Sequence, residues 1–109
     1  MQRMGMVIGV RPEKLDDYKA LHAEVWPEMR VLLSKYNIRN YSIYLREPEN
    51  LLFGYWEYVG SNYEGDLAAL GAEAVTQEWL AVCDPCQLPL PTREKGEWWA
   101  SMEEIFHLD

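Results

Sequence analysis

Residues 41–59 of the chain read YSIYLREPENLLFGYWEYV, two apolar and aromatic runs separated by REPEN. The two runs predict β-strands at residues 41–45 and 51–59, because aromatic and branched side chains favour strands. The residues between them, 46–50, include a proline and an asparagine and predict a turn. The two strands should therefore pair as an antiparallel hairpin in the middle of the chain.

The segments on either side of this hairpin predict the rest of the fold. Residues 4–10, MGMVIGV, predict a first strand, and apolar residues at steps of three and four predict a helix over residues 12–36. Pro27 interrupts that helix and should kink it or split it in two. After the hairpin, residues 66–82 predict a second helix and residues 103–108, EEIFHL, predict a last strand.

The predicted order of elements is β-α-β-β-α-β, an α+β fold with the ferredoxin-like arrangement. A chain of 109 residues fits a single domain spanning residues 1–109. The arrangement places both helices on one face of the sheet. Strand 51–59 carries apolar or aromatic side chains toward both faces, so the second face also needs a cover. A second copy of the chain is the simplest cover, and it predicts a homodimer that forms a dimeric α/β barrel.

The net charge of −8 argues against two classes of partner. An acidic surface repels nucleic-acid phosphates and anionic lipids, so we expect binding to neither. No apolar run approaches the length of a membrane span, and the first residues lack the pattern of a signal peptide. We therefore expect a cytoplasmic protein whose ligand is a small molecule.

The two cysteines form a CxxC motif, Cys83-Asp84-Pro85-Cys86. A redox pair would sit at the start of a helix, whereas this motif follows a helical pattern. A zinc site would need further ligands, and both histidines of the chain lie far away in sequence. We expect free thiols with a structural role, and no metal site.

His22 shares the apolar stripe of the first predicted helix with Tyr18, four residues earlier. The two side chains should therefore point inward together. One interpretation is that they line a ligand cavity, and the other is a core histidine bonded to a backbone carbonyl. Aromatic residues with polar edges either line the same cavity, as sugar-binding sites require, or fill the core: Tyr41, Tyr44, Tyr55, Trp56 and Trp79.

Two aromatic features near the end of the chain are less specific. His107 falls in the last predicted strand, where we expect it to be structural or exposed. The pair Trp98-Trp99 precedes that strand, and it either packs on a partner subunit or forms a lid over the cavity.

Several stretches of the chain resemble the L-rhamnose mutarotase family. They are YKALH at 18–22, VWPEM at 25–29, NYSIYL at 40–45, NLLF at 50–53 and GEWWASMEEIFHL at 96–108. The resemblance implies a dimeric α/β barrel that interconverts the anomers of L-rhamnose without a cofactor. It also implies that His22 is the proton donor and that Tyr18 and Tyr41 contact the sugar.

The family has two adjacent tryptophans in the second helix, and this chain keeps the first as Trp79 and has Leu80 in place of the second. We expect both positions to contact substrate. The substitution affects the identity of the sugar more than the chemistry, so a related 6-deoxy sugar is an alternative to L-rhamnose.

Mutarotation requires a proton to leave the anomeric hydroxyl and a proton to reach the ring oxygen. A histidine is suited to this work because its ordinary pKa is about 6.5. We expect protonated His22 to donate to the ring oxygen, while water, Tyr18 or an acidic residue serves as base. Two other functions fit the same architecture: a cofactor-free monooxygenase, and a non-catalytic dimer that binds a small molecule.

Overall fold

A computed structural model describes all 109 residues of the chain. Its strands are β1 (Gln2–Val10), β2 (Ile38–Arg46), β3 (Leu51–Tyr58), β4 (Gln87–Leu88) and β5 (Ala100–Met102). Its helices are α1 (Leu15–Ala23), α2 (Pro27–Lys35), α3 (Tyr63–Ala72) and α4 (Ala74–Cys83), with 3₁₀ turns at Pro12–Lys14 and Asp84–Cys86. No helix combines the length and the hydropathy that a membrane span needs.

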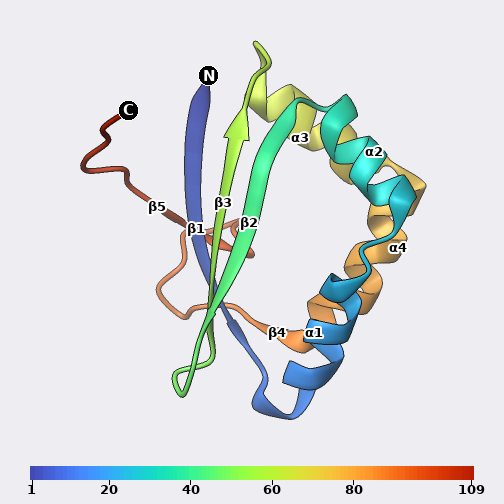
Figure 1. Cartoon of the computed structure of the whole chain (residues 1–109), viewed down its shortest axis with the longest axis vertical. Helices are drawn as coiled ribbons and strands as arrows, with labels where there is room; N and C mark the ends of the chain where they lie inside the picture. The colour runs from blue at the N-terminus through green and yellow to red at the C-terminus, as the bar shows by residue number, and fades with distance from the viewer.

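The strands form one antiparallel sheet in the order β2-β3-β1-β4, and β5 also pairs with β1. This order is the ferredoxin-like arrangement, so the predicted fold class is confirmed. The helices cover one face of the sheet (Figure 1). We call this the helix face and the opposite side the outer face.

The central hairpin is present, and β2 begins earlier than the expected Tyr41, at Ile38. Its last pair is Arg46 with Leu51, and the turn ends at Asn50 with a positive φ of 57°, which asparagine tolerates. The pairing of β2 with β3 shifts register between Arg39 and Ser42, which marks a β-bulge.

Pro27 splits the first predicted helix into α1 and α2, as expected. The residue before it, Trp26, is extended with a ψ of 131°, because the proline ring disfavours a helical conformation there. Pro27 itself is the first residue of α2, where its missing N–H leaves no helical hydrogen bond unmade.

The prediction of one helix over residues 66–82 is wrong, because the structure has α3 and α4 with a break at Glu73. Glu73 is extended, with a ψ of 137°. Its carboxylate accepts hydrogen bonds from the Tyr36 hydroxyl at 2.6 Å and from Lys35 Nζ at 3.3 Å. These contacts hold the break against the end of α2.

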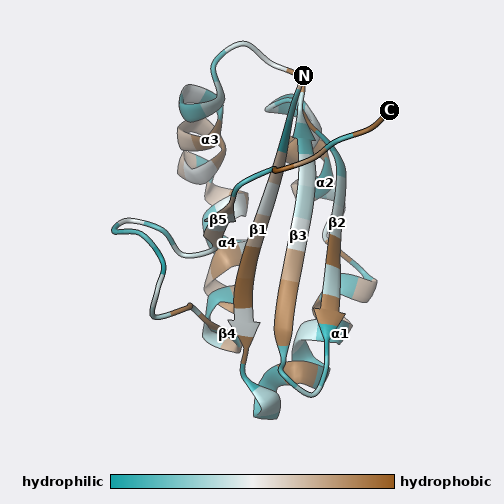
Figure 2. Ribbon diagram, turned by 90° about the vertical axis from the view of Figure 1, so that its left-hand side faces the viewer, coloured by the Kyte–Doolittle hydropathy of each residue, from teal (hydrophilic) through white to brown (hydrophobic).

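The prediction of a strand at residues 103–108 is also wrong. The pairing of this last segment with β1 stops at Met102, opposite Gly5, although residues 2–4 of β1 have no strand partner on that side. After Met102 the chain leaves the sheet and crosses its outer face (Figure 2), where Glu104 Oε2 lies 2.9 Å from Arg3 Nε. His107 is accordingly outside any strand, with its Nε2 2.7 Å from Asp109 Oδ1.

Two buried clusters hold the helices and the sheet together. The first joins Ile8 and Val10 of β1 to Leu52, Tyr18 and Cys86, and the second lies among the helices. Both cysteines are free and buried, which agrees with the expected structural thiols. Burial raises the pKa of Cys83, at the end of α4, to about 12.

Candidate functional site

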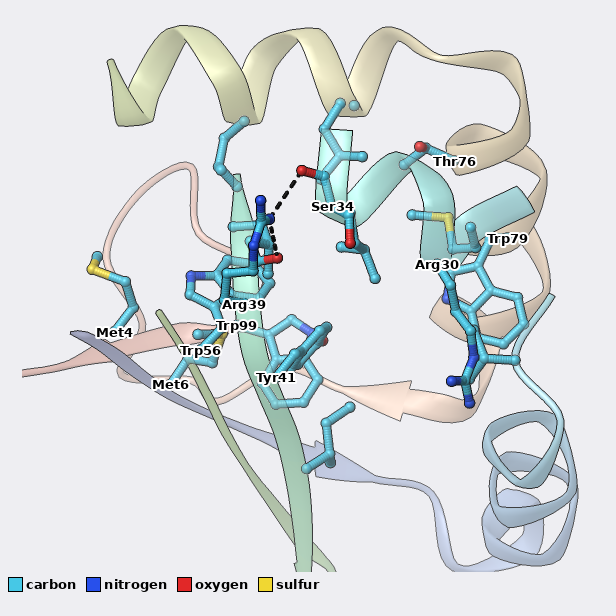
Figure 3. A pocket seen from close by; sticks show the side chains of 18 of the residues that line it. Met4, Met6, Arg30, Ser34, Arg39, Tyr41, Trp56, Thr76, Trp79 and Trp99 are labelled. Atoms are coloured by element: carbon cyan, nitrogen blue, oxygen red, sulfur yellow. Dashed lines mark hydrogen bonds between the residues drawn. The ribbon is translucent and has the colours of Figure 1, made fainter. Parts of the chain in front are cut away.

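A cavity of about 840 Å³ lies between the helix face of the sheet and the helices. This volume falls within the range of roughly 300–1,000 Å³ that is typical of small-molecule sites. Figure 3 shows Met6, Tyr41, Trp56 and Trp99 on the sheet side of the cavity. Most of the lining is apolar, so the few polar groups in it carry the chemistry.

His22 belongs to the last turn of α1 and lines this cavity. Its Nδ1 lies 2.9 Å from the backbone carbonyl oxygen of Tyr18. Because a carbonyl oxygen can only accept, Nδ1 carries the hydrogen and Nε2 carries the lone pair in the neutral ring. The protein provides no hydrogen-bond partner for Nε2. One ring nitrogen is thus fixed by the backbone, and the other is available to a ligand.

Burial lowers the pKa of His22, and the hydrogen bond to the Tyr18 carbonyl offsets part of that effect. Partial removal from water disfavours the charged imidazolium. The resting side chain is therefore neutral at pH 7, with a basic Nε2. This differs from the expectation of a histidine that is already protonated before it meets the sugar.

Two aromatic rings hold the imidazole of His22. The ring of Tyr18 lies 4.1 Å away between centroids, tilted by 47°. The ring of Trp79 lies 5.3 Å away at an angle of 64°, in an edge-to-face contact, and Trp26 packs on Trp79 at 5.0 Å. These contacts restrict the orientation of the catalytic candidate.

Tyr18 itself lies behind His22 in the first buried cluster, and it is not part of the cavity lining. Its side chain is 4% exposed, and its hydroxyl accepts a hydrogen bond from Gln87 Nε2 at 3.2 Å. Burial raises the pKa of this phenol, so it stays protonated. Its expected contact with the sugar stays a prediction.

Tyr41, Trp79 and Leu80 all line the cavity together with His22. Tyr41 follows Asn40, whose positive φ of 49° lies within the β-bulge of β2. A bulge redirects side chains, and here Tyr41 packs edge-to-face on Trp56 at 4.9 Å. Four of the five predicted site residues thus meet at one cavity.

Two aromatic candidates, Tyr44 and Tyr55, do not line the cavity. Tyr44 is three residues from Tyr41, and Tyr55 is adjacent to Trp56, so strand alternation places both on the outer face. The interpretation of these two residues as cavity lining is wrong.

The charged lining residues are Arg30 and Arg39, and no aspartate or glutamate lines the cavity. The chain contains 18 acidic residues, so their absence from the lining is a marked asymmetry. Arg39 donates to the carbonyl oxygens of Ser34 and Ile38 at 3.0 and 2.9 Å (Figure 3). An acidic side chain of this cavity therefore cannot be the base that the sequence left open.

Thr76 is a lining residue that the sequence analysis missed. Its side chain is 4% exposed, and its hydroxyl oxygen has no hydrogen-bond partner in the protein. An unpaired buried hydroxyl is costly unless a ligand satisfies it. Its place in α4, three residues before Trp79, is the signal that could have revealed it, since residues three apart share a helix face.

Groups of three or more histidine, cysteine, aspartate or glutamate residues that could hold a metal ion do not occur in the structure. The polar chemistry at the cavity is that of one imidazole, hydroxyl groups, the amide of Asn40 and two guanidinium groups.

Comparisons with known proteins identify relatives over the full length of the chain. Residues 3–108 match the family model described as L-rhamnose mutarotase. A protein of Oceanobacillus iheyensis named L-rhamnose mutarotase is 32% identical, and the match covers all of both chains.

Solved structures with a similar fold are also found. The L-rhamnose mutarotase FA22100 from Formosa agariphila matches with a TM-score of 0.78 at 22% identity, over all of both chains. Tetracenomycin F2 cyclase from Streptomyces glaucescens, a type-II polyketide cyclase, matches with a TM-score of 0.74 at 15% identity, over 100% of this chain and 98% of that one. At these identities the structures establish a shared architecture.

Proposed function

Because the chain belongs to the L-rhamnose mutarotase family, we propose that it is an isomerase that interconverts the α and β anomers of L-rhamnose or a related 6-deoxy sugar. The observation that carries this proposal is the free Nε2 of His22 at a sugar-sized cavity. The cavity combines flat aromatic surfaces with a few hydroxyl groups, which suits a sugar ring with apolar faces and a polar rim.

The reaction begins with neutral His22. Its Nε2 accepts the proton of the anomeric hydroxyl while the bond between C1 and the ring oxygen breaks, which leaves an aldehyde and an alkoxide. The imidazolium then donates the same proton to the former ring oxygen. One nitrogen can serve both atoms in turn, because both oxygens are bonded to C1 in the closed ring.

Ring closure reverses these steps on the other face of the aldehyde. After rotation about the bond between C1 and C2, Nε2 takes the hydroxyl proton as that oxygen attacks C1, and returns it to the carbonyl oxygen. Protons and electrons balance without any redox change or group transfer. His22 thus acts as both base and acid, and each transfer contributes roughly 10²–10⁴-fold.

The remaining lining orients the sugar. Trp79 and Trp56 offer flat surfaces for the C–H faces of the ring, and the hydroxyls of Tyr41 and Thr76 bond its rim. Leu80 leaves room where a tryptophan would narrow the cavity. The family resemblance gives Tyr18 a contact with the sugar, which its hydroxyl would make as a donor because no protein group accepts its hydrogen.

The family match, and not the fold, favours the mutarotase over a cofactor-free monooxygenase. The same architecture supports a polyketide cyclase at a TM-score of 0.74, so fold alone does not separate these chemistries. The match over residues 3–108 and the full-length relatives all carry one name.

The enzyme is a cytoplasmic homodimer in this proposal. Val7, Phe53 and Tyr44 lie side by side across three strands on the outer face. The segment that crosses this face carries exposed apolar side chains at Ile105 and Phe106, which are 89% and 79% exposed. A second copy of the chain would bury Tyr44, Ile105 and Phe106 together in a self-complementary interface.

Saturation-transfer NMR on L-rhamnose tests the proposal, because it measures exchange between the two anomeric protons directly. We expect the wild-type protein to accelerate exchange and His22→Ala to lose at least about 10²-fold of that rate. The other histidine supplies a matched control, since His107→Ala should exchange at the wild-type rate. Equal rates of anomer exchange for His22→Ala and wild type would contradict the proposed mechanism.

A further inference from the structure

Three side chains form a hydrogen-bonded chain behind the cavity. Trp98 Nε1 donates to Gln87 Oε1 at 2.7 Å, and Gln87 Nε2 donates to the Tyr18 hydroxyl at 3.2 Å. Gln87 is 4% exposed and belongs to β4, where its backbone pairs with the buried Val10. A buried amide is costly unless it is hydrogen-bonded, and here both ends of the amide have partners.

Trp98 determines which atoms donate and which accept along these hydrogen bonds. The indole N–H of Trp98 can only donate, so the amide oxygen of Gln87 must face it. The amide NH₂ must then face Tyr18, and the phenol oxygen must accept. The hydroxyl hydrogen of Tyr18 is consequently not used by Gln87, and no other protein group accepts it.

Tyr18 contacts His22 in two ways. Its backbone carbonyl holds His22 Nδ1 at 2.9 Å, and its ring packs against the imidazole at 4.1 Å between centroids. Any group that fixes the Tyr18 ring therefore limits the rotation of the imidazole. Gln87 is the group that fixes the far end of that ring.

We propose that Gln87 is a positioning residue for mutarotation, which with Trp98 holds Tyr18 against His22 and leaves the Tyr18 hydroxyl hydrogen free for a sugar oxygen. This inference rests on the proposed function, because the groups that Gln87 positions are its acid–base residue and its predicted sugar contact.

The first test is Gln87→Met, which keeps the length and the apolar volume and removes both hydrogen bonds. We expect kcat for anomer exchange to fall about tenfold, the scale of one lost hydrogen bond, with KM changed less. In a Tyr18→Phe background, Gln87→Met should cause no further loss, because the phenol that Gln87 holds is already absent. Additive losses, or no loss in the single variant, would overturn the proposal.

The second test, Gln87→Glu, reverses donor and acceptor in the hydrogen bond between residue 87 and Tyr18. An ionised carboxylate accepts from both neighbours and captures the Tyr18 hydrogen, whereas the protonated acid accepts from Trp98 and donates to Tyr18 as glutamine does. The variant should therefore be slow at neutral pH and recover as the pH falls through the pKa of its carboxyl. A purely structural residue would leave the shape of the pH profile unchanged, and an unchanged shape contradicts the inference.

A ligand-free measurement separates this inference from the proposed function. If the wild-type protein fails to accelerate exchange, the proposed function fails, and the NMR titration of His22 still tests the positioning. Gln87→Met should shift the imidazole resonances and the pKa of His22, while Tyr58→Phe, which removes a buried hydroxyl elsewhere, should not. An unchanged His22 titration in Gln87→Met overturns the positioning.

If both variants at position 87 fail to fold, the exchange rate of Trp98→Phe tests the positioning role of Gln87 instead. Trp98 is 41% exposed, so its substitution is tolerated better. The change frees the Gln87 amide to turn over, and kcat should fall by a few-fold. A wild-type rate in folded Trp98→Phe overturns the proposal.

Discussion

His22 Nδ1 is hydrogen-bonded to the backbone carbonyl oxygen of Tyr18, one helical turn earlier, at 2.9 Å. This bond assigns the hydrogen to Nδ1 and leaves Nε2 as the reactive atom. Since burial lowers the pKa of His22, the basic form predominates at neutral pH. The hydrogen bond therefore determines which nitrogen reacts, and burial keeps that nitrogen unprotonated before the sugar binds.

The first prediction concerns pH. The neutral imidazole starts the reaction, so kcat/KM for anomer exchange should be constant around neutral pH and fall as the pH drops through the pKa of His22. Because that pKa is lowered, the midpoint should lie below the ordinary value of about 6.5. Exchange rates at a series of pH values, with an NMR titration of His22 in parallel, measure both quantities. A rate that declines as the pH rises through neutrality would instead require the imidazolium as the starting form.

The second prediction concerns Thr76, whose buried hydroxyl has no partner in the protein. Thr76→Val removes the unpaired group and keeps the shape, so the free energy of unfolding without sugar should rise by about 1 kcal/mol. KM for the sugar should rise by about 3- to 10-fold, because a hydrogen bond to the substrate is lost. Chemical denaturation and NMR exchange measure the two effects. Thr76→Ser is the matched control that keeps the hydroxyl, and an unchanged KM in Thr76→Val would exclude a contact with sugar.

The order of the main elements was predictable because each carries a local signal. The apolar run at residues 4–10, the REPEN turn and Pro27 each act within a few residues, and all three were confirmed. The break at Glu73 and the position of the last strand depend on partners far away in sequence. Glu73 is held by the end of α2, and the last segment pairs with β1 only as far as Met102 before it leaves the sheet.

The residues of the candidate site also fall into those that local sequence predicts and those that depend on contacts between distant segments. Helical spacing predicted that His22 points inward, and the cavity lining agrees. The spacing could not distinguish Tyr41 from Tyr44, because the β-bulge that directs Tyr41 is a feature of the pairing between strands. Gln87 was missed since an isolated glutamine near three prolines gives no signal for burial. Its proposed role depends on Tyr18, which is 69 residues away in the sequence, and on Trp98.

The third prediction concerns the CxxC motif. Cys83 and Cys86 are 3% and 4% exposed, and burial raises the pKa of both thiols. Thiolates are the reactive form, so neither cysteine should react with a thiol reagent at pH 8 while the protein is folded. Both should react rapidly in denaturant. Fast labelling of the folded protein would contradict the assignment of these residues as structural thiols.

The fourth prediction concerns the outer face of the sheet. Tyr44 is 67% exposed in the single chain and adjoins Phe53 across the hairpin, so a partner subunit would bury it. Tyr44→Glu would place an unpaired charge in that interface, and the dissociation constant of the dimer should rise about 10- to 100-fold. Light scattering after gel filtration over a dilution series measures the change. Val31→Glu is the matched control, because Val31 is 66% exposed and lies on α2, away from this face. We expect wild type and Val31→Glu to remain dimeric where Tyr44→Glu is monomeric, and a dimer that tolerates Tyr44→Glu would place the interface elsewhere.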